Sequence, residues 1–167
     1  MKVNSLLVKL SVFTCGLLLG MAPVRADQAE DREAIKALMW HYARALDSFD
    51  PDAYAALYTP DGQFGSGTTA AKGSEALKKM IVGVRDGREK RKAEGQAVAP
   101  MFHMTTDSWI EFVDATHARH HSYWLTVFGA EGKGSKPSIE AAGRGVDEVV
   151  KVNGKWLIKA RDVAPRD

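Results

Sequence analysis

The stretch Val152-Asn153-Gly154-Lys155-Trp156-Leu157-Ile158 decides the fold of this chain. An Asn-Gly pair between two apolar runs is a strong signal for a tight β-hairpin, so we expect strands over 138–152 and 155–163. Upstream, residues 102–113 and 117–128 have the same strand-like composition and are joined by the short link Asp114-Ala115-Thr116. The second half of the chain therefore predicts an antiparallel meander of four strands.

The first half of the chain predicts helices. Apolar residues recur at helical spacing between about 28 and 46, namely Ile35, Leu38, Met39, Tyr42, Ala45 and Leu46. Asp50-Pro51-Asp52 is typical of a helix start, which predicts a short helix over 51–58, and a third helix is expected from Ser74. Residues 85–96 are charged and contain two glycines, so they form either a frayed helical extension or a loop. Helices followed by a meander predict an α+β fold, with the helices covering one face of the sheet.

The N-terminus resembles a secretory signal. Lys2 and Lys9 precede or enter an apolar run that ends before Val24 and Ala26, a pair that fits the small-residue cleavage pattern. We expect residues 1–26 to be a cleaved signal peptide and 27–167 to be the mature domain. An uncleaved membrane anchor is the alternative, but the apolar run is short for a span.

Cleavage changes what composition implies. The whole chain has 23 basic and 21 acidic residues, and removing Lys2, Lys9 and Arg25 leaves one more acid than base. Nothing then favours a nucleic-acid partner, because no large positive field remains. The single cysteine, Cys15, lies within the predicted signal, so the mature chain has no disulfide or thiolate metal site. Export without disulfides predicts a bacterial periplasmic protein with no membrane contact after cleavage.

Several segments resemble one known family in the expected order. These are residues 42–50 (YARALDSFD), 57–64 (LYTPDGQF), 102–106 (FHMTT), 122–124 (SYW) and 152–158 (VNGKWLI). Over about 29–163 the chain resembles the SnoaL-like branch of the nuclear-transport-factor-2-like (NTF2-like) superfamily. The resemblance implies a cone-shaped α+β barrel, in which a curved antiparallel sheet wraps around the N-terminal helices and a deep pocket. Relatives include scytalone dehydratase, ketosteroid isomerase, limonene epoxide hydrolase and polyketide cyclases.

The resemblance also implies chemistry and assembly. Such relatives typically act on hydrophobic, ring-bearing small molecules without metal or organic cofactor, so we expect no cofactor and no metal here. A homodimer through the outer face of the sheet is also expected. Two histidines and one carboxylate can bind a metal in principle, but no short ligand spacing in this sequence supports a metal site.

Three residues are the candidate catalytic group. The dehydratase aspartate falls on Asp47, and its two histidines fall on His103 and on either His120 or His121. An ideal helical wheel places Asp47 roughly 140° from the apolar stripe, which favours solvent, whereas the resemblance favours the pocket. Strict alternation puts His103 on the face of Thr105, Asp107 and Trp109. The same alternation sends His120 and His121 to opposite faces of the sheet, and we favour His120 as the one that faces the pocket.

The substrate-binding candidates are mostly aromatic: Tyr42, Tyr58, Phe64, Trp109, Trp124 and Arg144. The pocket tyrosine that the dehydratase has beside its aspartate is Leu46 here, and its second tyrosine aligns near Phe64. These departures put dehydration itself in question while leaving an acid–base group in place.

The leading hypothesis is a cofactor-independent lyase or isomerase that uses an Asp-His pair for dehydration, proton transfer or retro-aldol elimination. The alternative is a small-molecule-binding or scaffold protein of the periplasm that performs no chemistry. Epoxide hydrolysis is a third option, but it needs an Asp-Arg-Asp group for which only scattered candidates exist.

Overall fold

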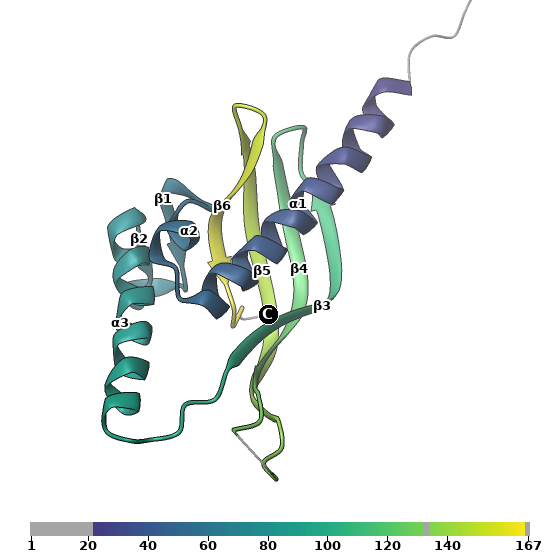
Figure 1. Cartoon of the computed structure of the whole chain (residues 1–167). Coiled ribbons are helices and arrows are strands. Elements are labelled where there is room, and N and C mark those ends of the chain that lie inside the picture. Colours follow the sequence, from purple (N-terminus) through teal and green to yellow (C-terminus); the bar gives the residue numbers. More distant parts are fainter. Residues whose placement is uncertain (1–21, 132–133, 166–167) are drawn as a thin grey trace, which may run out of the picture.

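The protein is built on one curved, unclosed sheet of six strands in the order β2-β1-β6-β5-β4-β3 (Figure 1). The computed structural model describes residues 22–131 and 134–165. Most of the predicted signal peptide therefore lies outside the described residues. Helix α1 (Ala22–Ser48) runs diagonally across one face of the sheet, and α3 (Ser74–Ala93) stands beside its β1–β2 edge. The predicted α+β fold is confirmed.

The four predicted strands are present with small changes at their ends. The strands are β1 (Tyr58–Phe64), β2 (Ala71–Lys72), β3 (Met101–Phe112), β4 (His117–Phe128), β5 (Ser138–Val152) and β6 (Lys155–Asp162). Strands β3 to β6 form the expected antiparallel meander. One pairing was not predicted, because β1 returns from the helices to lie parallel to β6.

The helices differ more from prediction. Asp50 caps α2 (Pro51–Ala55) by accepting hydrogen bonds from the amides of Asp52 and Ala53. This helix ends earlier than expected because Tyr58 already belongs to β1, and the Leu57 carbonyl accepts a hydrogen bond from the amide of Ile158. A short 3-10 turn (Gly67–Thr69) precedes β2.

Helix α3 continues through Gly87 and ends at Ala93, before Gly95, so the helical alternative for residues 85–96 applies to most of the segment. Arg88 anchors this extension. Its guanidinium donates to the Ala99 carbonyl at 2.5 Å and lies 4.8 Å from the centre of the Phe49 ring. A buried arginine with both partners fixes the last turns of the helix against the body of the protein.

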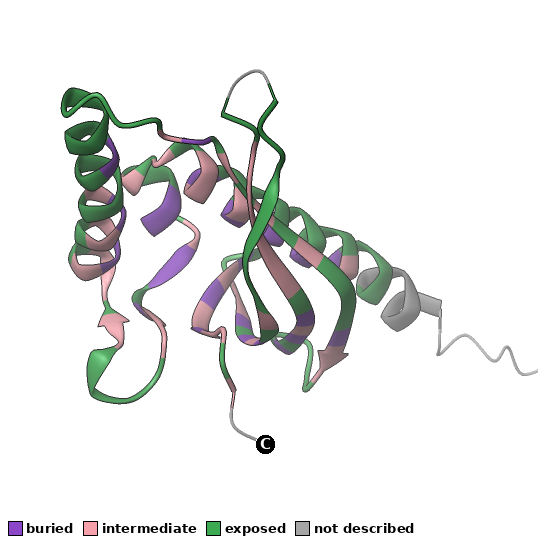
Figure 2. Ribbon diagram, turned by 90° about the horizontal axis from the view of Figure 1, so that it is seen from below, coloured by how far each residue is buried: buried purple, intermediate pink, exposed green. Residues whose placement is uncertain are grey.

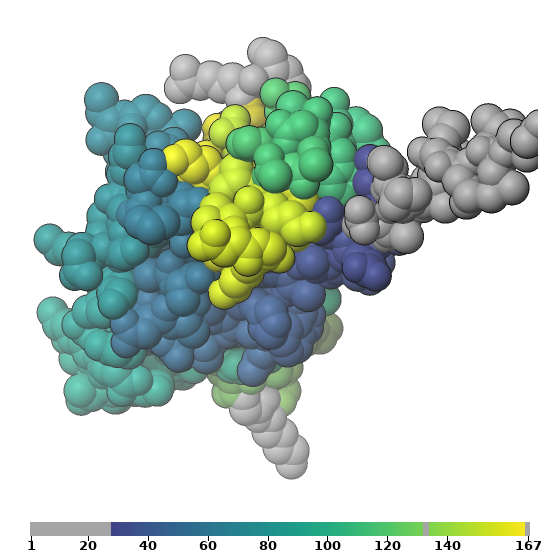
Figure 3. Space-filling view, turned by 90° about the horizontal axis from the view of Figure 1, so that it is seen from above, coloured from purple at the N-terminus to yellow at the C-terminus, as the bar shows by residue number. Residues whose placement is uncertain are grey.

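The core lies between α1 and the sheet, where buried residues of both layers face each other (Figure 2). The apolar stripe of α1 and alternate residues of the central strands form it: Ile35, Leu38, Met39, Tyr42, Ala118, Val149, Trp156 and Ile158. At one end of the sheet the β3–β4 and β5–β6 turns lie side by side (Figure 3), joined by a 2.7 Å hydrogen bond from the amide of Lys151 to the carbonyl of Thr116.

Asp31 holds this end of the core together. Its carboxylate accepts 2.8 and 2.7 Å bonds from Trp156 Nε1 and Lys151 Nζ. Burial alone would raise the pKa of Asp31, but the hydrogen bonds from Lys151 and Trp156 prevail, so the pKa lies below its usual value. In the described part of the chain, no helix is both long and apolar enough to cross a bilayer.

A β-bulge in β3 corrects the predicted alternation. The register with β4 shifts by one residue between Thr106 and Trp109, and Asp107 adopts a left-handed backbone with φ of 46°. One extra residue on one strand reverses the faces of all residues beyond it. Trp109 therefore turns outward, where it is 58% exposed, and Ser108 turns toward the covered face.

Candidate functional site

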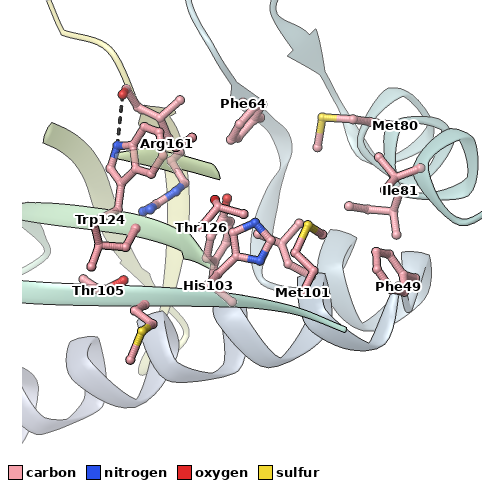
Figure 4. A pocket seen from close by; sticks show the side chains of 17 residues that line it. Phe49, Phe64, Met80, Ile81, Met101, His103, Thr105, Trp124, Thr126 and Arg161 are labelled. Carbon is pink, nitrogen blue, oxygen red and sulfur yellow. Dashed lines mark hydrogen bonds between the residues drawn. The ribbon is translucent and has the colours of Figure 1, made fainter. Parts of the chain in front are cut away.

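A cavity of about 360 Å³ opens between α1, α3 and the covered face of the sheet (Figure 4). Most of its wall is apolar: Leu46, Phe49, Phe64, Met80, Ile81, Val84, Met101, Met104, Leu125, Ala141 and Val163. A few polar or polar-tipped side chains also line it: Tyr42, His103, Thr105, Trp124, Thr126 and Arg161. An apolar pocket with a small number of convergent polar groups is suited to a ring-bearing small molecule.

His103 lines the cavity and contacts Asp47, which is not itself a lining residue. Asp47 Oδ1 lies 2.9 Å from His103 Nδ1 and accepts a second 2.9 Å hydrogen bond from the His103 amide. The two side chains are only 11% and 23% exposed. The helical-wheel expectation of a solvent-facing Asp47 is therefore wrong. The reason is tertiary, because β3 passes beside the last turn of α1 and places its donors there.

This geometry selects a tautomer for His103. A carboxylate only accepts hydrogen bonds, so the neutral imidazole places its proton on Nδ1 and leaves Nε2 unprotonated. The ring lies among the side chains of the cavity wall (Figure 4). His103 is thus arranged as a base whose orientation is fixed by Asp47.

Arg161 contributes the positive charge of the cavity. Its Nη1 donates to Asp147 Oδ2 at 2.5 Å, and its guanidinium lies 4.1 Å from the centre of the Tyr42 ring. Burial alone would lower the pKa of Arg161, but its interactions with Tyr42 and Asp147 raise the pKa above its usual value. The guanidinium therefore remains charged inside the protein.

Sequence reasoning missed Arg161 and chose Arg144 instead. Regular alternation from Trp156 and Ile158 would turn Arg161 outward, but the register between β5 and β6 shifts after Val149 and Ile158, and this extra residue in β6 turns Arg161 inward. Arg144 lies opposite Tyr123 on the exposed side and does not line the cavity.

Three tyrosines form a buried row behind the cavity. The rings of Tyr42, Tyr54 and Tyr58 follow each other at 5.4 and 5.2 Å, and the hydroxyls of Tyr54 and Tyr58 are 2.9 Å apart. Burial raises the pKa of each phenol. Tyr42 lines the cavity, whereas Tyr58, predicted to bind substrate, is part of the core behind it.

The predicted aromatic wall is divided between two faces. Phe64 and Trp124 line the cavity (Figure 4). Trp124 Nε1 donates 3.0 Å bonds to the carbonyls of Val163 and Arg144. Gly143 makes room for this indole, because a Cβ there would lie 2.6 Å from Trp124 Cζ2. Trp109 is on the outer face, where its ring stacks on His121 with 4.9 Å between centroids.

His120 is held in a separate cluster. Its Nδ1 lies 2.9 Å from Asp147 Oδ2 and its Nε2 lies 2.6 Å from Ser108 Oγ. His120 faces inward and His121 outward, but His120 does not line the main cavity and is not in hydrogen-bond contact with Asp47. Of the three predicted catalytic residues, Asp47 and His103 are in contact, and His120 shares with His103 only the wall of a second groove between α1 and β3. Within residues 22–131 and 134–165, no three His, Cys, Asp or Glu side chains are placed to bind a metal.

Comparisons with known proteins agree with this architecture. Residues 27–162 match the SnoaL-like domain family. A structure from Novosphingobium aromaticivorans, described as a candidate scytalone dehydratase, is 27% identical with a TM-score of 0.65, covering 83% of this chain and 85% of that chain. An NTF2-like protein with a cystatin-like fold from the same organism is 22% identical with a TM-score of 0.68, covering 86% and 87%.

A Catenulispora acidiphila protein in complex with S-DNPA is 21% identical with a TM-score of 0.60, covering 80% of this chain and 92% of that chain. No match was found among curated proteins. Since the matched region spans nearly all of the described residues, this chain belongs to the SnoaL-like domain family.

Proposed function

We propose that this protein is a cofactor-independent lyase or isomerase that acts on a hydrophobic, ring-bearing small molecule. The observation that carries the proposal is the 2.9 Å contact between Asp47 Oδ1 and His103 Nδ1 at the wall of an apolar cavity. A base held in one tautomer by a carboxylate, with water largely excluded, is suited to moving a proton between carbon and oxygen.

In the proposed reaction, His103 Nε2 removes a proton from a carbon beside a carbonyl group, or from a hydroxyl group. Negative charge then develops on a substrate oxygen, and the Arg161 guanidinium with the Tyr42 hydroxyl stabilises it. Return of the proton to another carbon gives an isomerase, whereas loss of a hydroxyl or breaking of a carbon–carbon bond gives a lyase. Phe64, Trp124 and Met80 hold the ring of the substrate.

In this scheme Arg161 and Tyr42, instead of the predicted catalytic residue His120, stabilise the charge that develops on the substrate oxygen. The His120 ring nitrogens are both within hydrogen-bond distance of protein partners, whereas Arg161 and Tyr42 line the cavity that contains His103. The alternative function is a binding or scaffold protein without chemistry, which the mostly hydrocarbon wall of the cavity favours.

Assembly and location belong to the same proposal. The outer face of β3 and β4 exposes large apolar side chains, namely Phe102, Trp109 and Tyr123. Contiguous apolar surface of this kind marks an interaction site, which supports a homodimer through the sheet. Export to a bacterial periplasm, without later membrane contact, remains a prediction from the N-terminal sequence.

The test uses a generic carbon acid, so it does not require the natural substrate. In 5-nitrobenzisoxazole, removal of one carbon-bound proton breaks the N–O bond and releases a coloured cyano-nitrophenolate. We expect Asp47→Asn and His103→Ala each to lower turnover at least about a hundredfold while the variants remain folded by circular dichroism.

His117→Ala is the matched control, because His117 also pairs with an aspartate, Asp114 Oδ2 at 3.0 Å, but is exposed to solvent. Full activity of His103→Ala would remove the proposed mechanism. A protein that binds the probe but never turns it over would favour the binding alternative. Mass spectrometry of molecules that co-purify with the mature protein would then identify the ligand class.

A further inference from the structure

A second reactive group lies outside the main cavity. Ser108 Oγ, the His120 ring and the Asp147 carboxylate form a continuous chain, with 2.6 Å from Ser108 Oγ to His120 Nε2 and 2.9 Å from His120 Nδ1 to Asp147 Oδ2. The two ring nitrogens contact different partners. This is the order of contacts by which an imidazole removes the proton of a serine while a carboxylate orients the ring.

The His120–Asp147 end of this series of contacts is buried, and its geometry selects the tautomer of a neutral His120 ring. His120 and Asp147 are almost completely buried, and Arg161 donates to the same Asp147 oxygen that faces His120. A carboxylate paired with arginine can only accept from His120 Nδ1, so His120 Nε2 is the acceptor for the Ser108 hydroxyl. The imidazole is therefore arranged as a base toward the serine.

Ser108, at the other end of this series of contacts, is accessible. Ser108 is exposed and lines a groove of about 420 Å³ between α1 and the edge strand β3. The floor and sides of this groove are mainly apolar, with Met39, Trp40 and Met104 among the lining residues. A small ester with an aromatic or alkyl part could reach the hydroxyl there.

The β3 bulge creates this arrangement. With regular alternation, Ser108 would lie on the opposite face from His103 and could not contact His120. The left-handed backbone at Asp107, directly before Ser108, is unfavourable for a residue with a side chain, and such conformations concentrate at functional sites. Bulges likewise recur beside active sites, where they redirect one side chain.

We propose that Ser108 is a nucleophile activated by His120 and Asp147, and that it accepts acyl groups from small esters in the α1–β3 groove. Ser108 Oγ forms a bond to the carbonyl carbon while its proton passes to His120 Nε2. The ester C–O bond breaks, and the departing oxygen takes that proton. Water then attacks the acyl-serine and gives a proton to His120. As the bond between the acyl carbon and Ser108 Oγ breaks, His120 returns that proton to Ser108 Oγ, and the carboxylic acid is released. His103 also lines this groove but has no part in the proposed acyl transfer.

The test is labelling of the full mature chain with a fluorophosphonate, which reacts with activated serines, followed by peptide mass spectrometry. We expect one adduct, on Ser108, that is absent in Ser108→Ala. Replacing the base by His120→Gln should slow labelling at least about a hundredfold. The same proteins should release nitrophenol from p-nitrophenyl acetate with the same rank order.

A surface cluster supplies the matched control. This cluster also combines a hydroxyl, an imidazole and a carboxylate, from Thr116, His117 and Asp114. The hydroxyl and the carboxylate both lie within 3.1 Å of the same ring nitrogen, His117 Nδ1, so the ring cannot pass a proton from one nitrogen while the carboxylate holds the other. His117→Ala should not change labelling. If His120→Gln does not fold, Ser108→Ala alone decides, because its side chain is exposed. No adduct on Ser108, or equally fast labelling of folded His120→Gln, would overturn the proposal.

Discussion

Removing the Asp147 carboxylate should destabilise the protein more than any surface change. In Asp147→Ala, the Arg161 guanidinium and His120 Nδ1 lose the acceptor that they share. The side chains of Asp147 and Arg161 are 0% and 3% exposed, so water does not replace the lost carboxylate as a hydrogen-bond acceptor. Breaking a buried ion pair by removing one partner typically costs about 3–5 kcal/mol. For a domain of this size the melting temperature should fall by roughly 10 °C or more.

The assay is urea unfolding followed by tryptophan fluorescence, with the slope checked for two-state behaviour. Glu33→Ala is the control, because the Glu33–Lys36 pair is mostly exposed and should contribute less than about 0.5 kcal/mol. Asp147→Ala combined with Arg161→Met should cost less than the sum of the single changes, since no unpaired charge remains. A loss below about 1 kcal/mol in Asp147→Ala, or strict additivity in the double variant, would refute the reasoning.

Three further predictions follow from other parts of the fold. Gly143→Ala should displace the Trp124 indole, lower stability by about 1–3 kcal/mol and weaken ligand binding in the cavity, measured by unfolding and by calorimetry; unchanged binding would contradict this. Burial alone would raise the pKa of Asp31, but hydrogen bonds such as that from Lys151 outweigh burial and bring the pKa below its usual value. The ionised form of Asp31 therefore stabilises the fold. Asp31→Asn should therefore be less stable than wild type at pH 7, and the difference should shrink as the pH falls below 3.8 and be lost once the pH passes below the lowered pKa of folded Asp31; a pH-independent difference would argue against it. Tyr123→Glu should convert the proposed dimer to a monomer in light scattering, and a wild-type monomer would remove that proposal.

The strands and helices could be predicted because local patterns determine them. The Asn153-Gly154 turn and the apolar stripe around Ile35 and Leu38 need no information about distant residues. The parallel pairing of β1 with β6 could not be predicted in this way, because it depends on how the helices return the chain to the sheet.

The site was only partly predictable, and two register shifts explain much of what was missed. Regular alternation assigned Trp109 to the pocket, but the bulge at Asp107 reversed the faces of Ser108 and Trp109. A second shift turned Arg161 inward. Bulges leave no reliable signal in composition, so periodicity is correct only up to the bulge.

The pairing of Asp47 with His103 was expected from family resemblance and not from periodicity. The two residues are 56 positions apart, and the helical wheel alone would have placed Asp47 in solvent. A contact between a helix end and an edge strand depends on the packing of whole elements, which no local pattern encodes.

The most direct test of the account is the tautomer of His103, measured by long-range nitrogen-15 NMR at a pH where the ring is neutral. The account predicts a protonated Nδ1 and an unprotonated Nε2 in the wild type, and a mixture of tautomers in Asp47→Asn. A wild-type ring with its proton on Nε2, or a spectrum that Asp47→Asn leaves unchanged, would contradict the claim that Asp47 orients His103 as the base of the cavity.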